Sequence, residues 1–466
     1  MRPFPISTAC AILATGLALA CAHWARPAIR GPQMAQFRAV FDVAPDGAPM
    51  LPVALRIPPE RTLPAPIGNR ALIVNRLLDD SNGALDAFYT DLWHTERRQK
   101  GAITRIVHYG DSPTTADLIT GDVRSMLQKR FGWAGHGFIL AAKPWAWYQH
   151  TGAELSGSGW QASAGSHFEA KDGMFGLGGV SFSSGSGAKT RIVFSGEGHT
   201  RFEVWFLKQP GGGNFEVFAG GQPLGEVETG AETKSPGFAE FNVDGGARRV
   251  EIQAEGAPVR IFGVSAEGAG PGVVYDSLGL NGASIGVLTH MFNERHWAAE
   301  LQHRAPSLVI VNYGTNEADF ASFIEKQYQK ELREAIRRIR AALPHTSILV
   351  MSPMDRGHRG PDGIETMPTI PQLVAIQRGV AADTGCGFFD TYTAMGGQGT
   401  MGRWYAAEPR LVGADFIHPM PAGAKIVGEL LYNALRDGYN QYKLRQLNDS
   451  SGVQTGSKSG PTPGSQ

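Results

Sequence analysis

The chain has 466 residues, which is long enough for more than one domain. Lys+Arg and Asp+Glu are both 43, so the formal charge is zero, and this balance excludes the basic surface of a nucleic-acid-binding protein or of one held on an anionic membrane. The 42% of hydrophobic residues excludes a wholly disordered chain, and the 60 glycines favour many turns and strands.

The N-terminus is typical of an export signal. Arg2 is followed by an uncharged, apolar stretch from Ile6 to Ala22, and residues 1–25 are therefore predicted to be a signal peptide or an N-terminal anchor. The run Ala18-Leu19-Ala20-Cys21 resembles the lipobox of bacterial lipoproteins, so a lipoprotein acylated at Cys21, a cleaved signal and a retained anchor all stay open. Each of them predicts export to the periplasm or cell envelope. Residues 26–69 are rich in Pro and Ala and are predicted to be a linker.

Residues 70–150 predict the first part of an α/β domain. A helical pattern of apolar residues covers Leu72 to Trp93. A β-branched strand from Ile103 to Tyr109 ends in the turn Gly110-Asp111-Ser112, and a helix is expected from Asp117 to Phe131. Strand, glycine turn and helix form the opening unit of a parallel sheet.

Residues 151–268 predict an all-β insertion. Short alternating runs are bounded by Gly, Pro or Asn, and no helical pattern lies between them. This spacing is typical of a β-sandwich or jelly roll. The runs are Arg201–Phe206, Asn214–Phe218, Phe238–Phe241 and Arg249–Ile252.

Residues 269–446 return to the α/β pattern. The expected elements are strands at 308–312, 348–352 and 388–390, and helices at 320–343, at 373–382 and from Pro421 onward. Residues 447–466 are rich in Ser, Gly and Thr and are predicted to be a disordered tail.

Three polar segments lie at predicted strand-to-helix edges, where sheets of this kind place their sites. Ser112 follows the first strand, Asn316 follows the strand at 308–312, and Asp415 stands three residues before His418 and Pro419. Taken singly, each is compatible with a helix cap or a surface loop. Together, in this order, they predict a nucleophilic serine with a histidine base, an orienting aspartate and an amide donor for an oxyanion.

These segments resemble the motif blocks of the SGNH hydrolases, also called GDSL-type esterases. Gly110-Asp111-Ser112 with Asp117 resembles the first block and implies Ser112 as nucleophile. Gly279 to Ser284 resembles the second block and implies that the N–H of Gly282 joins the oxyanion hole with the N–H of Ser112. Gly314 to Glu317 resembles the third and implies Asn316 as the side-chain donor, although the family more often has Asp where Glu317 stands. The last block implies Asp415 and His418 as acid and base.

The resemblance implies a flavodoxin-like three-layer α/β fold with a parallel sheet, interrupted by the β insertion. It also implies a serine esterase that works through an acyl-enzyme and needs no metal or other cofactor. The insertion resembles the β module of exported peptidoglycan O-acetylesterases, so the expected substrate and partner is an O-acetylated polysaccharide or peptidoglycan. Two alternatives stay open, namely an O-acetyltransferase with the same triad and a glycan-binding protein with an inactive triad. The substrate-binding residues cannot be assigned from the sequence.

Other chemistry-bearing residues fit structural roles better. Four histidines lack a carboxylate three residues ahead and a following proline, and they are weaker candidates for the base: His108, His136, His150 and His358. Trp145-Ala146-Trp147-Tyr148 is either a sugar-stacking platform or core, with core favoured, as it is for Trp205. Cys386 is expected to be a buried small residue, and Arg333, Arg337, Arg338 and Arg340 to form the solvated face of a helix.

Overall fold

The computed structural model describes residues 77–80, 82–167 and 171–455. The predicted export signal with Cys10 and Cys21, and the linker at 26–69, lie outside the described residues. No helix in those three ranges is long and apolar enough to cross a bilayer.

A six-stranded sheet, here called the α/β sheet, carries the first set of predicted strands. Its order is β1-β17-β14-β13-β2-β12; β1 pairs antiparallel with β17, and the other pairs are parallel. The bounds are β1 (Leu78–Asp79), β2 (Ile103–Gly110), β12 (Gly272–Gly279), β13 (Leu308–Asn312), β14 (Ser347–Met351) and β17 (Gly387–Phe389). The predicted strand at 308–312 is confirmed as β13. Its apolar residues are buried on both faces of the sheet, as is usual for parallel strands.

Helices cover both faces of the α/β sheet. Alternate strand residues point to opposite faces, so Ile310 packs with α4, α6 and α13, whereas Val309 packs with α7, α9 and α10. The helix bounds are α4 (Asp86–Glu96), α5 (Ser112–Thr115), α6 (Leu118–Phe131), α7 (Glu294–Arg304), α8 (Ala321–Phe323), α9 (Gln329–Ala342), α10 (Thr369–Asp383), α11 (Thr391–Ala394), α12 (Thr400–Ala406) and α13 (Pro421–Thr455). The short 3-10 and π helices are η1 (Gly165–His167), η2 (Val287–Met291), η3 (Glu317–Asp319) and η4 (Ile324–Tyr328). The expected three-layer α/β architecture is confirmed.

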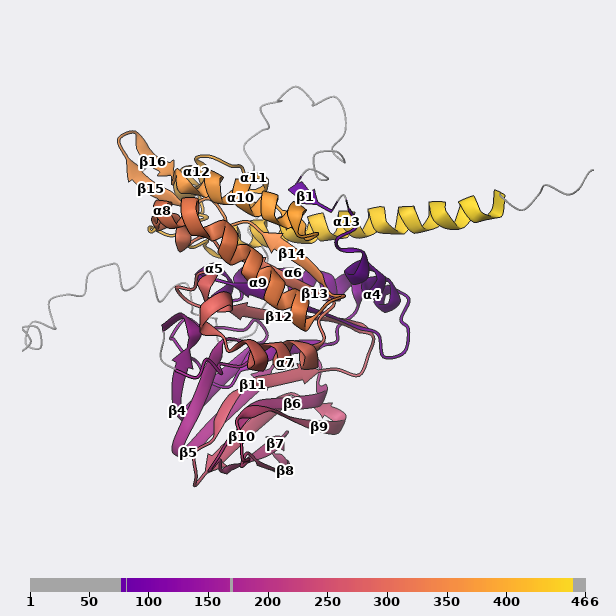
Figure 1. Ribbon diagram of the computed structural model, residues 1–466. Coiled ribbons are helices and arrows are strands. Elements are labelled where there is room, and N and C mark those ends of the chain that lie inside the picture. Colours follow the sequence, from indigo (N-terminus) through magenta and orange to yellow (C-terminus); the bar gives the residue numbers. More distant parts are fainter. Residues whose placement is uncertain (1–76, 81, 168–170, 456–466) are drawn as a thin grey trace, which may run out of the picture. The chain divides into compact units, whose positions relative to one another are not determined.

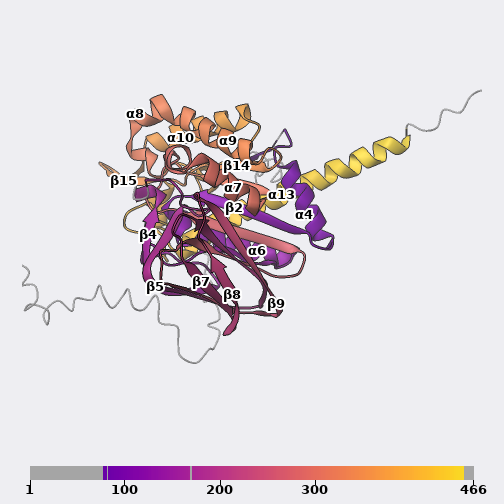
Figure 2. The same cartoon turned by 60° about the horizontal axis from the view of Figure 1, so that its bottom comes forward.

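A nine-stranded antiparallel sheet, the insertion sheet, follows β2 and α6 in the chain and precedes β12. Its strands gather below the α/β sheet in Figure 1 and come forward in Figure 2. Its order is β8-β7-β10-β5-β11-β6-β9, with β3 paired to β11 and β4 paired to β5. The bounds are β3 (Gly135–Leu140), β4 (Ala153–Ala164), β5 (Val180–Phe194), β6 (His199–Lys208), β7 (Asn214–Ala219), β8 (Gln222–Glu228), β9 (Ser235–Ala247), β10 (Arg249–Glu255) and β11 (Arg260–Glu267). A two-stranded hairpin, β15 (Gly357–Gly360) and β16 (Gly363–Thr366), lies outside both sheets.

The structure corrects three sequence expectations. Strand β3 pairs with β11, so the insertion sheet includes residues well before the predicted boundary at 151. The helical pattern expected from Leu72 is replaced at Leu78 by β1, because Leu78 pairs with Phe389 at the sheet edge, and α4 begins only at Asp86. Helix α13 extends to Thr455, so residues 447–455 are helical where a disordered tail was expected.

Candidate active site

Ser112 lies where β2 ends and α5 begins, at the carboxyl edge of the α/β sheet. The backbone of Asp111 is extended and Pro113 occupies the first turn, so the chain bends sharply at the serine. Ser112 Oγ lies 2.8 Å from His418 Nε2, and His418 Nδ1 lies 2.6 Å from Asp415 Oδ2. The structure thus brings these three predicted residues into one hydrogen-bonded relay, although Ser112 and His418 are 306 positions apart in the chain.

The turn between Asp415 and His418 is held by its own backbone. Asp415 Oδ1 accepts hydrogen bonds from the N–H groups of Ile417 at 3.0 Å and of His418 at 3.1 Å. Burial acts to raise the pKa of Asp415, but the hydrogen bonds from His418 and Ile417 outweigh it and hold that pKa below its usual value. Asp415 therefore stays ionised and fixes the proton of the imidazole on Nδ1.

Phe416, within this turn, adopts a left-handed backbone with φ of +59°. A bulky residue in this region costs about 1–3 kcal/mol, so the surrounding structure must hold it there. Its carbonyl accepts from Gly357 N at 3.0 Å, and its ring packs edge-on against Tyr405 with centroids 4.9 Å apart. The turn that carries His418 is thereby fixed to β15 and α12.

The predicted oxyanion donors lie on the loops after β12 and β13. Gly282 is exposed and has φ of +70°, a conformation that glycine adopts without strain. Asn316 Nδ2 donates to the carbonyl of Ala283 at 2.7 Å, which joins the two loops and leaves the amide a second N–H. A further glycine, Gly279, permits close packing at the end of β12, since a Cβ there would lie 2.3 Å from Thr115 N.

Two buried carboxyl groups beneath these loops were not assigned from the sequence. Glu317 Oε1 accepts from Ile285 N at 2.7 Å, which also ties the loop after β12 to the loop after β13. Burial raises the pKa of Glu317 to about 7, against the opposing bond from Ile285 and with a contribution from Asp111. Burial likewise raises the pKa of Asp111 to about 6, although bonds from Thr315 oppose it. The only signal in the sequence was Glu317 standing where the related motif has Asp.

Protonation of Glu317 should make the free energy of unfolding depend on pH. Because its folded pKa is about 7 and its usual value is 4.5, the folded state holds a proton that the unfolded state loses. The wild type should therefore lose about 3 kcal/mol of stability as pH rises from 4.5 to 8, relative to Glu317→Gln. Urea unfolding of both proteins at several pH values measures this difference. A parallel pH dependence of the two proteins would contradict the assignment.

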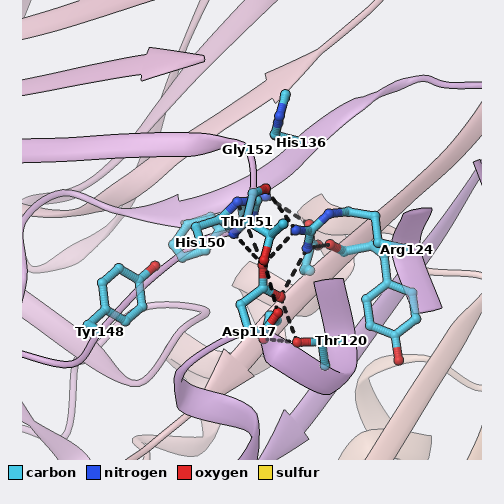
Figure 3. Close-up of polar contacts among 12 residues, drawn as sticks. Asp117, Thr120, Arg124, His136, Tyr148, His150, Thr151 and Gly152 are labelled. Carbon is cyan, nitrogen blue, oxygen red and sulfur yellow. Dashed lines mark hydrogen bonds and ion pairs between the residues drawn. The ribbon is translucent and has the colours of Figure 1, made fainter. Parts of the chain in front are cut away.

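Asp117, which completes the first block of the motif, lies among Thr120, Arg124 and Thr151 (Figure 3). Its carboxylate forms a buried ion pair with Arg124 at 2.6 Å and accepts from Thr120 Oγ1 at 2.6 Å and from Thr151 N at 2.7 Å. The charge of Arg124 and these hydrogen bonds outweigh burial and hold the pKa of Asp117 well below its usual value. Asp117 therefore ties the start of α6 to the segment that leads into β4.

The competing histidines lie elsewhere in the fold. His108 Nδ1 lies 2.7 Å from Tyr275 Oη, and burial lowers the pKa of His108 to about 4. His136 Nδ1 lies 2.9 Å from His199 Nε2, and His150 is buried beside Asp117. His358 lies on β15.

Most of the aromatic and sulfur residues singled out in the sequence are buried, but Trp147 is exposed. Trp205 and Cys386 are buried, as expected. In the run Trp145 to Tyr148, Tyr148 is buried and its hydroxyl accepts a hydrogen bond from Leu140 N, as expected for core. Trp147, by contrast, is 51% exposed.

Arg338 contradicts the expectation of a solvated arginine face. Its side chain is buried and donates to the carbonyls of Leu288 and Phe292, the latter at 2.7 Å. The backbone carbonyls of η2 and of its C-cap, Phe292, provide these acceptors, which no helical pattern reveals. Arg333 and Arg337 do form ion pairs near the surface, with Asp383 and with Glu334. Arg340 donates to the carbonyl of Thr346 at 2.7 Å.

Within residues 77–80, 82–167 and 171–455, no group of three or more His, Cys, Asp or Glu side chains is placed to hold a metal ion.

Part of the chain resembles a known protein family, and its fold resembles that of solved esterase structures. Residues 253–426 match the model of the GDSL-like Lipase/Acylhydrolase family, a range that contains Gly282, Asn316, Asp415 and His418 but not Ser112. A solved structure described as a peptidoglycan O-acetylesterase in action has 24% identity and a TM-score of 0.67, and the match covers 78% of this chain and 99% of that one. An acetylxylan esterase from Geobacillus stearothermophilus has 19% identity and a TM-score of 0.27, covering 35% and 72%. No curated protein matches the chain.

The family match and the shared fold confirm the resemblance stated from the sequence. The larger similarity extends into the insertion as well as the α/β sheet, since it covers 78% of this chain. Residues 253–426 thus match the GDSL-like lipase/acylhydrolase family, and the fold of the chain is similar to that of a solved peptidoglycan O-acetylesterase.

Proposed function

We propose that this enzyme hydrolyses O-acetyl esters on a cell-wall or extracellular polysaccharide, with Ser112 as nucleophile, His418 as base and Asp415 as its orienting acid. The observation that carries the proposal is the relay itself, in which Oγ of Ser112 lies 2.8 Å from Nε2 of His418. At this distance a proton can pass from Oγ to Nε2. Because Asp415 holds the imidazole proton on Nδ1, Nε2 carries no proton and can accept one.

The reaction has two steps. His418 Nε2 takes the proton of Ser112 as Oγ attacks the ester carbonyl, and the imidazolium then gives that proton to the departing sugar oxygen. A water molecule, deprotonated by His418, attacks the acetyl-serine and releases acetate while the proton returns to Ser112. In both steps the negative oxygen is stabilised by the N–H groups of Ser112 and Gly282 and by Nδ2 of Asn316.

The substrate class is supported by exposure and by the related fold. The side chains of His418 and Asp415 are 46% and 48% exposed, so a polymer can approach the reacting atoms from solvent. The structural relative that spans the insertion is described as a peptidoglycan O-acetylesterase. The apolar segment at residues 6–22 supports a location outside the cytoplasm, where such polymers lie.

The test follows acetate and the acyl-enzyme together. Wild-type protein is given an O-acetylated oligosaccharide and the released acetate is quantified. In parallel, the protein is labelled with a fluorophosphonate probe and digested, and mass spectrometry of the peptides locates the modified residue. Free acetate and a single adduct on the peptide that contains Ser112 support the proposal. Acetyl groups moved to an added oligosaccharide without free acetate would instead identify a transferase, and no turnover together with no adduct would identify an inactive site.

Loss of the Asn316 amide should slow the chemical step. Asn316→Ala removes one oxyanion donor, and we expect kcat for an aryl acetate to fall about 10²–10³-fold with KM changed less than about threefold. Steady-state kinetics measures both constants. Asn214→Ala, which changes an exposed residue at the start of β7 in the insertion, is the control and should match wild type. A change confined to KM would remove Asn316 from the oxyanion hole.

A further inference from the structure

A cavity of about 380 Å³ lies beside Gly282. Three segments line it: the η1 turn of the insertion, the loop and π-helix that follow β12, and the stretch from α8 through η4 to α9. The lining residues are Gly165, Ser166, Gly282, Ser284, Gly286, Val287, His290, Met291, Phe323, Gln327 and Glu331. A volume of this size is typical of a small-molecule site, roughly 300–1,000 Å³, and is far more than an acetyl group needs.

The walls of the cavity differ in chemistry. Glu331 accepts a hydrogen bond from Thr289 Oγ1 at 2.6 Å and pairs with His290 Nε2 at 2.9 Å. The exposed Gln327 adds an amide, while Phe323 and Met291 offer half-buried apolar surface. Hydroxyl partners beside an apolar face match a sugar ring, which has polar edges and C–H faces.

Hydrogen bonds hold the walls of the cavity together. Arg338 on α9 donates to Phe292 O at 2.7 Å and to Leu288 O. Helix α9 is therefore bonded to η2 near both ends of η2. Thr289 and Glu331 add a third link between the same two segments. Such a rigid site loses little conformational entropy when it binds.

The insertion supplies one wall. Gly165 lies so close to η2 that a Cβ there would meet the Phe292 ring at 2.9 Å, and Asn293 N donates to Gly173 O at 2.9 Å. The cavity is therefore shared by the insertion and by the domain that carries Ser112.

We propose that this cavity is a subsite for one neutral sugar unit of the acetylated polysaccharide and that the insertion completes it; the inference rests on the proposed function above. Among the described residues that line the cavity there is no Lys or Arg, and Glu331 contributes a carboxylate. A uronic acid would meet that negative charge, and the imidazole of His290 is already paired with Glu331, whereas hydroxyl and acetamido groups bond to Glu331, Gln327 and Ser284.

Binding is tested apart from turnover. The full chain with Ser112→Ala is titrated by calorimetry with N-acetylglucosamine tetramer, xylotetraose and a galacturonic acid tetramer. We expect at least one neutral tetramer to bind and the acidic one to bind at least tenfold more weakly. Adding Gln327→Ala or Glu331→Gln should raise Kd about three- to tenfold, the effect of losing one hydrogen bond.

Two neighbours on the same helix serve as matched controls. Gln329→Ala and Glu325→Gln change exposed residues outside the cavity lining and should leave Kd within twofold. Absence of binding by both neutral tetramers, stronger binding of the acidic one, or equal effects of cavity and control variants would each overturn the subsite. Binding with these effects, in a wild-type protein that releases no acetate, would support the subsite and reject the proposed hydrolysis.

Discussion

Ser112→Ala is expected to lower kcat for an aryl acetate by at least about 10⁴-fold, to the residual rate that the oxyanion hole and substrate binding support alone. Alanine has no group to attack the carbonyl or to give a proton to His418, so the acyl-enzyme cannot form. His418→Ala should have a similar effect, and the double variant should be little worse than either single one, because the two side chains act as a unit. Acetate release at saturating substrate measures all three.

The control for this series is Ser156→Ala, which changes an exposed serine on β4. It should keep wild-type kinetics, and circular dichroism should show all variants folded. Residual activity of Ser112→Ala within tenfold of wild type would mean that another group is the nucleophile.

Asp117→Ala is expected to destabilise the protein by about 3–5 kcal/mol, the largest change in stability anticipated here. The substitution leaves the buried guanidinium of Arg124 without its counter-charge and Thr151 N without an acceptor. Because the folded pKa of Asp117 is depressed, its contribution is complete above the unfolded pKa near 4 and declines as pH falls below it. Urea unfolding at pH 7 gives the free energies.

A double variant separates the ion pair from packing. Asp117→Ala with Arg124→Ala should cost less than the sum of the single changes, because the second change removes the stranded charge. Asp91→Ala, on the exposed face of α4, should lie within about 0.5 kcal/mol of wild type. Strict additivity of the two single variants would indicate that the pair is not coupled.

Much of the α/β sheet was predictable because its strands are buried on both sides. The strand at 308–312 is a continuous apolar run, and such runs need no knowledge of their partners to be recognised. The relay was predictable for a related reason. Ser112, Asn316 and His418 each follow a strand or precede a helix, and the carboxyl ends of parallel strands meet at one edge.

The missed features depend on contacts between distant segments. β3 has a short apolar pattern compatible with either sheet, and only its pairing with β11 assigns it to the insertion. Arg338 is polar and helical, yet the carbonyls of η2 accept its hydrogen bonds inside the core. The bond between Glu317 and Ile285 likewise joins loops 32 positions apart, and no local pattern encodes it.

The pairing at the base of the insertion has a consequence for how the chain folds. β2 and β12 are parallel neighbours in the sheet, yet the whole insertion sheet lies between them in the chain. At a synthesis rate of roughly 5–20 residues per second, β12 is therefore made on the order of ten seconds after β2. Gly135 pairs with Glu267, and Gly268 N donates to Ala134 O at 2.9 Å. Once the insertion has formed, its two ends are therefore adjacent, and the loop entropy of joining β12 to β2 is that of a short connection. Early closure of the insertion thus lowers the effective contact order of the catalytic sheet.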